Sequence, residues 1–192
     1  ALEYVDQALP NAESLGQAML LRLSTLGLQA ALDASSTAQV GPDRVDAFVA
    51  LVLQRVERVE SAGLRADAAL VLAQREHALS QPASTARWLE RAQQDAGAPE
   101  QKARVAYYRR ALGVDQRSAD DWLAELAQIT QATREVCEGE VRGLLMLARE
   151  AAKGGHQEDA RRWAGRAFDR ALTSNNRVWL RLVERVADEI DP

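Results

Sequence analysis

The chain has 192 residues and a mass of 21.1 kDa, which is enough for one well-filled core or two small domains. Hydrophobic residues make up 47% of the sequence and charged residues 27%, so the chain is not of the disordered class. A net charge of −4 gives no general attraction for nucleic acid or an anionic membrane. A single cysteine excludes an internal disulfide framework and a Cys-cluster zinc site, and two histidines are few for a metal centre built from histidine. We therefore expect neither a metal nor a cofactor.

Apolar residues recur at helical spacing along almost the whole chain, and no stretch alternates for long enough to predict a strand. We predict that Pro10 stops a short first helix and that Asn11 caps a second, which runs to about Asp33. Because apolar residues surround more than half of this second helix, either later helices or a second copy of the chain must cover it. We therefore expect an N-terminal apolar helical segment over residues 1–40, with a homodimer through this end as one alternative. Its apolar residues are Leu15, Met19, Leu20, Leu21, Leu23, Leu26, Leu28 and Leu32.

Residues 41–192 are predicted to form a helical-hairpin repeat domain, in which proline and glycine mark the helix ends. The stretch 35–41 has the composition of a linker. After it, Pro42 begins a helix that we expect Gly63 to end. Further helices are predicted over residues 64–79, 83–96 and 99–113.

The second half of the chain carries the longest apolar stripe. Ser118 is a predicted N-cap, and from Trp122 the stripe continues to Ala151 without a proline. One helix of that length would be far above the usual three or four turns, so we predict a break at Gly139 and Gly143. The residues expected to lie in the core of this half include Trp122, Cys137, Trp163 and Trp179.

The last two predicted helices are separated by a short turn at residues 173–176, and short turns make neighbouring helices antiparallel. We therefore predict an all-α fold of about nine or ten helices, stacked as antiparallel hairpins. The stretch from Leu144 to Ala171 resembles a tetratricopeptide repeat, with Ala148 and Ala160 at the small positions where the paired helices approach closely.

A second, poorer match to the same family begins at Trp88 and places Tyr108 at an aromatic position. The resemblance implies an irregular tetratricopeptide-like α-solenoid whose concave face binds a peptide or protein. Another helical-hairpin solenoid and a compact bundle stay open as alternatives.

No glycine-rich phosphate loop and no H-E-x-x-H motif occur in the sequence, and we expect no catalytic residue and no enzyme. We predict instead a protein–protein interaction scaffold or regulatory module that binds a protein or peptide partner in a helical groove. Trp88 is a candidate partner-binding residue because Arg87 and Arg91 flank it. Tyr107 and Tyr108 are the others, since neighbours on a helix point about 100° apart and cannot both enter one core.

An anion-binding surface is the alternative function. Between Arg161 and Arg185 the sequence has seven arginines against two acids, Asp169 and Glu184. Forked guanidinium groups suit nucleic acid, phosphate or an acidic peptide, whereas the same rows can be a solvated face with pairs such as Glu158–Arg162. The candidate anion-binding residues form two rows, Arg162, Arg166 and Arg170 on one helix, and Arg177, Arg181 and Arg185 on the next.

The most apolar stretch, residues 15–32, also contains Arg22, and an arginine at the centre of a membrane helix costs about 2.5–3.5 kcal/mol. We interpret the stretch as a buried helix and expect no membrane partner. No secretory signal is visible in the sequence, and we expect a cytoplasmic protein. Because the first residue is Ala, a processed chain or a domain cut from a longer protein stays open.

Overall fold

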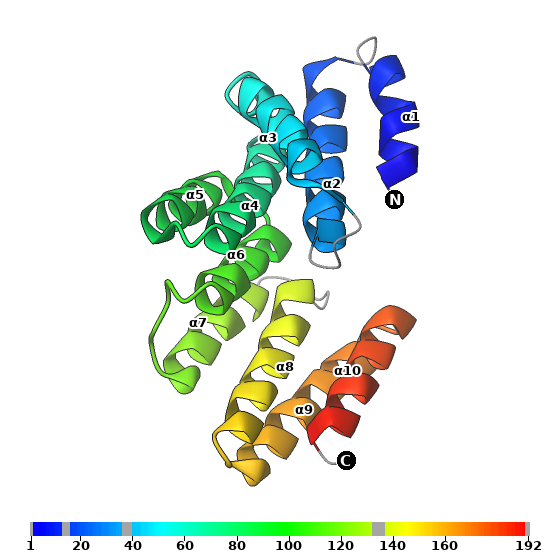
Figure 1. The fold of residues 1–192 in the computed structure, drawn as a ribbon. Helices are drawn as coiled ribbons and strands as arrows, with labels where there is room; N and C mark the ends of the chain where they lie inside the picture. The colour runs from blue at the N-terminus through cyan, green and yellow to red at the C-terminus, as the bar shows by residue number, and fades with distance from the viewer. Residues whose placement is uncertain (1, 13–15, 36–39, 132–136, 191–192) are drawn as a thin grey trace. The chain divides into compact units, whose positions relative to one another are not determined.

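A computed structural model describes residues 2–12, 16–35, 40–131 and 137–190 (Figure 1). In these ranges the structure has ten helices and no strand, which confirms the predicted all-α class. None of the described helices is both long and apolar enough to cross a membrane. The helices are α1 (Leu2–Ala12), α2 (Gln17–Ser35), α3 (Pro42–Val56), α4 (Ala62–Ala78), α5 (Pro82–Asp95), α6 (Pro99–Ala111), α7 (Ala119–Gln131), α8 (Glu138–Lys153), α9 (Gln157–Thr173) and α10 (Arg177–Ile190).

The contacts divide the chain into two compact units, Ala1–Gly97 and Ala98–Pro192, here called unit 1 and unit 2. The predicted boundary after residue 40 falls inside unit 1. In unit 1, α2 packs against α1, α3 and α4, and α4 forms a hairpin with α5. In unit 2, α8 packs against α6, α7, α9 and α10, and α9 packs against α10. The predicted hairpin of the last two helices is therefore confirmed.

The N-terminal helix boundaries differ from the prediction. Pro10 and Asn11 both lie inside α1, so Pro10 does not stop the first helix and Asn11 does not cap the second. A proline in the last turn removes one hydrogen bond at a point where the helix ends two residues later, and α1 tolerates that loss. The second helix begins instead after Gly16, whose φ of +89° lies in the left-handed region. Its carbonyl accepts a hydrogen bond from the Leu20 amide at 3.2 Å.

Other helices of unit 1 cover most of the apolar surface of α2. Leu20, Leu21 and Leu28 are buried, while Met19 and Leu26 stay exposed. Leu15 and most of the predicted linker lie outside the described residues. Helices α1, α3 and α4 of the same chain therefore cover most of α2. The alternative, in which a second copy of the chain covers it in an N-terminal homodimer, stays a prediction.

Gly63 does not end the helix that begins at Pro42, contrary to the prediction. The preceding helix, α3, ends at Val56, and Gly63 lies in the first turn of α4. The hydroxyl of Ser61 accepts a hydrogen bond from the Leu64 amide at 3.5 Å and so caps a new helix two residues before the glycine. Pro42 does begin α3, as predicted.

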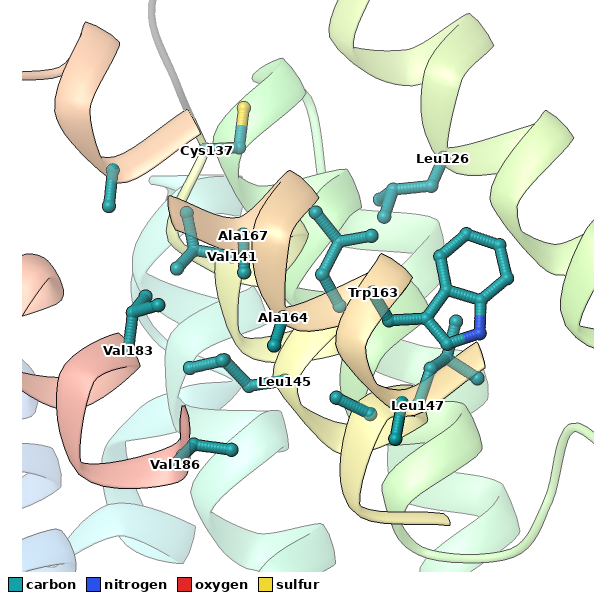
Figure 2. Close-up of a cluster of buried hydrophobic side chains, with 14 of the residues drawn as sticks. Leu126, Cys137, Val141, Leu145, Leu147, Trp163, Ala164, Ala167, Val183 and Val186 are labelled. Atoms are coloured by element: carbon teal, nitrogen blue, oxygen red, sulfur yellow. The ribbon is translucent and has the colours of Figure 1, made fainter. Parts of the chain in front are cut away.

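The core of unit 2 forms where α8, α9 and α10 meet (Figure 2). Trp122 of α7 is fully buried there, and its indole N–H donates to the Ala106 carbonyl of α6 at 3.2 Å. Trp163 and Cys137 are also buried and Trp179 is half-buried, which confirms three of the four expected core residues. The core side chains labelled in Figure 2 are Leu126, Cys137, Val141, Leu145, Leu147, Trp163, Ala164, Ala167, Val183 and Val186.

The predicted helix break at Gly139 and Gly143 is wrong. The described part of α7 ends at Gln131, α8 begins at Glu138, and both glycines lie inside α8. A Cβ at Gly139 would lie 2.4 Å from the Ala103 carbonyl of α6, and one at Gly143 would lie 2.2 Å from Cη2 of Trp122. These glycines therefore let α8 approach the backbone of α6 and the indole ring closely, which is a packing role and not a helix-ending one.

Gly139→Ala or Gly143→Ala should each lower the free energy of unfolding by about 1–3 kcal/mol, because a methyl group has no room at either position. Urea denaturation measures the change. Gly165→Ala on α9 is the matched control, since a Cβ there meets nothing within 4 Å. It should raise the stability of the monomer by about 0.5–1 kcal/mol through helix propensity alone. Equal effects at all three glycines would contradict the packing role.

Candidate functional site

A groove of about 350 Å³ lies on unit 2 and is lined by residues of α6, α8 and α10, of which α8 packs against both of the others. Helix α6 contributes Tyr107 to one wall, and α10 contributes Leu182 to the other. The floor is α8, whose Leu145 and Met146 supply apolar contact surface. The groove therefore combines an aromatic wall, an apolar floor and, on the same helix, several charges.

Four groove residues form one line along α8, here called the α8 stripe: Arg142, Met146, Arg149 and Lys153. Their spacing of i, i+4, i+7 and i+11 places them on a single helix face. Another face of α8 enters the core, as the burial of Val141, Leu144 and Ala148 shows. Packing of the core face thus fixes the direction in which the stripe points.

The charges of the α8 stripe are only partly neutralised. Arg142 binds Glu138 one turn earlier at 2.7 Å, and Arg149 donates two hydrogen bonds, of 2.8 and 3.0 Å, to Glu189 of α10. The Arg142–Glu138 pair is about half-exposed, and pairs of this kind contribute only about 0–1 kcal/mol, whereas the two hydrogen bonds from Arg149 to Glu189 make a stronger contact. Lys153 makes no ion pair with any residue that the structure describes. A ligand could therefore recruit Arg142 and Lys153 at little cost.

Of the two predicted tyrosines, Tyr107 lies at the groove, and Tyr108 packs against Tyr107. Their ring centroids are 4.9 Å apart and the ring planes meet at 63°, an edge-to-face arrangement. Tyr107 lines the groove, and both rings are half-buried. Burial raises the pKa of Tyr108, so its hydroxyl stays protonated at neutral pH.

Trp88 lies in unit 1, so the structure does not place it in one site with the tyrosines of unit 2. It is half-buried against the core of unit 1. Its remaining surface lines a separate hollow of about 400 Å³, together with Arg87, Glu90 and Arg91. The Arg87 guanidinium lies 5.9 Å from the centroid of the indole ring.

A buried carboxylate holds this hollow in shape. Asp95 accepts hydrogen bonds from Arg65 at 2.6 Å and from Arg91 at 2.8 Å, and Arg91 also binds Glu57 at 3.2 Å. Burial alone would raise the pKa of Asp95, but the hydrogen bonds and charges of the two arginines outweigh it and lower the pKa below its usual value. Arg65 further donates to the Val59 carbonyl at 2.8 Å and so ties the segment after α3 to α4 and α5.

The predicted arginine row on α9 is engaged within unit 2. Arg162 and Arg166 lie over the ring of Trp163, at 4.3 and 5.2 Å from its centroid. Arg162 also pairs with Asp159 at 3.0 Å, and Arg170 pairs with Glu140 of α8 at 2.8 Å. This row therefore lies on another face of α9 than the one bordering α10.

The row on α10 has different surroundings. Arg177, Arg181 and Arg185 are all exposed, and no hydrogen bond or ion pair joins them to a described residue. Because α9 borders α10 with Ala164, Gly165 and Phe168, the two predicted rows do not merge into one continuous surface.

The groove residues on α8 were missed by the sequence reading. Their regular spacing was the available signal, but the apolar residues of the same helix predict only the face that enters the core.

Among the residues that the structure describes, no group of three or more His, Cys, Asp or Glu could hold a metal ion. No protein-family model, curated protein or solved structure matches this chain.

The thiol of Cys137 should be inert in the folded protein. Burial, together with the nearby Glu100 carboxylate, raises the pKa of Cys137 to about 12, so almost no reactive thiolate exists at pH 8. We expect slow labelling by a disulfide-exchange reagent in buffer and complete labelling in denaturing urea. Rapid stoichiometric labelling of the folded protein at pH 8 would contradict this placement.

Asp95→Asn should destabilise unit 1 by about 1–3 kcal/mol at pH 7, because it removes the negative charge that two arginines share and replaces one of its two acceptor oxygens by a donor NH2 group. A carboxylate with a lowered pKa stabilises the fold above its unfolded pKa near 4, and this contribution is lost as the pH falls through the folded value. The stability gap between wild type and variant should therefore shrink below pH 4. Urea titrations at pH 7 and pH 3 test this, and a gap that does not change with pH would count against it.

Proposed function

We propose that this chain is a non-enzymatic interaction module that holds a peptide, or an exposed segment of a partner protein, in the groove between α6, α8 and α10. The same proposal treats the paired helices as an irregular, tetratricopeptide-like array acting in the cytoplasm. The observation that carries it is the groove itself, with its aromatic wall, apolar floor and loosely paired cations. Small-residue packing within the hairpin of α8 and α9 supports the repeat class, since Ala148 and Ala160 are both fully buried.

The groove offers the side chains that protein interfaces favour. Tyrosine and arginine are enriched among residues that dominate binding energy, and methionine adapts its shape to different apolar partners. Tyr107 stands at one side and Leu182 at the other, with Met146 between them. A peptide side chain that enters this space would lose contact with water on three sides.

The floor of the groove is also preorganised. Helix α8 contacts four other helices of unit 2, and two of its glycines rest directly on α6 and Trp122. A rigid floor lowers the ordering cost of binding, so more of the contact energy appears as affinity. The single ion pair of Arg142 with Glu138 can open toward a ligand, because a half-exposed pair of this kind contributes little to stability.

Nucleic-acid or other anion binding by the arginine rows is the second candidate. The unpaired arginines of α10 favour it. It has less support than the groove, because Trp163, Asp159 and Glu140 already engage the α9 row.

A random peptide library displayed on phage tests the groove proposal. Selected peptides should bind Tyr107→Ala and Met146→Glu at least about tenfold more weakly than wild type, since losing a hot-spot contact costs about 2 kcal/mol or more. Tyr4→Ala and Met19→Glu are matched controls, because both residues are exposed in unit 1. Circular dichroism checks that each variant is folded.

The control variants should bind as wild type does. A library that yields no peptide, or peptides whose binding ignores both groove variants, would overturn the proposal. Binding of a short DNA duplex that is lost in Arg177→Glu but kept in Tyr107→Ala would favour the second candidate instead.

A further inference from the structure

Helix α10 carries a second line of charged residues, here called the α10 stripe: Arg177, Arg181, Glu184 and Asp188. The spacing of i, i+4, i+7 and i+11 puts them on one face of the helix. In chain order, two positive charges are followed by two negative charges. The groove of the proposed function uses another residue of α10, Leu182, so the two surfaces are distinct.

All four residues of the α10 stripe are exposed. Their charged groups form no hydrogen bond or ion pair with any residue in the described ranges. Several other charges of unit 2 are paired, since Glu189 binds Arg149, Arg170 binds Glu140 and Arg162 binds Asp159. The charges of the α10 stripe are therefore exposed to solvent and available to a partner.

This order of charges makes the α10 stripe of one copy complementary to the α10 stripe of a second, antiparallel copy. When two copies of α10 lie antiparallel about a two-fold axis, the first residue of one stripe faces the last residue of the other. Arg177 then faces Asp188 of the second copy, and Arg181 faces its Glu184. A two-fold axis repeats each pair, so the eight residues of the two stripes make four ion pairs, each between opposite charges.

An apolar groove of about 350 Å³ borders the α10 stripe, with Glu184 and Asp188 on its edge. Ala164, Gly165 and Ala187 make it shallow and smooth, and Phe168 beside them is 40% exposed. Gly165 has no structural reason to be glycine within unit 2, because a Cβ would meet open space. Close approach of another helix would provide that reason, since glycine lets backbones come together.

We propose that α10 is a homodimer surface, on which a second copy of this chain docks antiparallel through the α10 stripe and covers the adjacent apolar groove. The self-complementary charge order selects a second copy over an unrelated partner. This dimer uses the C-terminal helix, not the N-terminal segment considered from the sequence, and it is independent of peptide binding.

Sedimentation velocity of the full chain over a range of concentrations and salt tests the proposal. The wild type should dimerise, and more weakly at high salt, because exposed ion pairs are screened. Arg181→Glu and Glu184→Arg should each weaken dimerisation by about tenfold or more, since each replaces two attractive pairs by two repulsive ones. The double variant, Arg181→Glu with Glu184→Arg, restores opposite charges at every position and should recover the dimer.

Arg166→Glu is the control, because it reverses an exposed arginine of α9 outside the α10 stripe. It should leave dimerisation unchanged, and circular dichroism should show all variants folded. A wild type that stays monomeric at the highest concentration would overturn the proposal. So would a double variant no better than the single ones, or a control that weakens the dimer equally.

Discussion

The close approach of α8 to the backbone of α6 and to the indole ring of Trp122 on α7 is the constraint on which unit 2 depends, and one glycine permits each contact. At Gly139 the helix rests on the Ala103 carbonyl, and at Gly143 it rests on the Trp122 ring. Because protein interiors are close-packed, a methyl group at either place must move a backbone or a fully buried indole. Such a movement would spread, since α8 also contacts α7, α9 and α10.

The same helix connects stability to the proposed function. One face of α8 carries Val141, Leu144 and Ala148 into the core, and another carries Arg142, Met146 and Arg149 into the groove. The groove therefore has its shape because the opposite contacts are fixed. A change at either glycine should disturb peptide binding even though neither glycine lines the groove. The α10 stripe depends on the same packing, because α10 contacts both α8 and α9.

Helical periodicity was enough to predict the all-α class, most helices and the closing hairpin, since each is decided within one stretch of chain. The errors at Pro10, Gly63, Gly139 and Gly143 arise because proline and glycine are compatible both with a helix end and with a position inside a helix. At Pro10 and Gly63 the neighbouring helix end or cap decides between the two, whereas at Gly139 and Gly143 residues distant in sequence decide. Trp122, which lies 21 positions before Gly143, is the neighbour that makes glycine necessary there. Likewise, the α8 stripe becomes a groove only when α6 and α10 flank it, which no local pattern reveals.

The most direct test of this account is a nuclear Overhauser measurement between Gly143 and Trp122. The structure places the ring edge where a Cβ of residue 143 would be, so an α-proton of Gly143 must lie close to the proton on Cη2 of Trp122. We predict a strong cross-peak between these two protons in the folded chain. Its absence, with both resonances assigned and the protein folded, would show that α8 does not rest on the indole and would contradict the assembly of the groove described above.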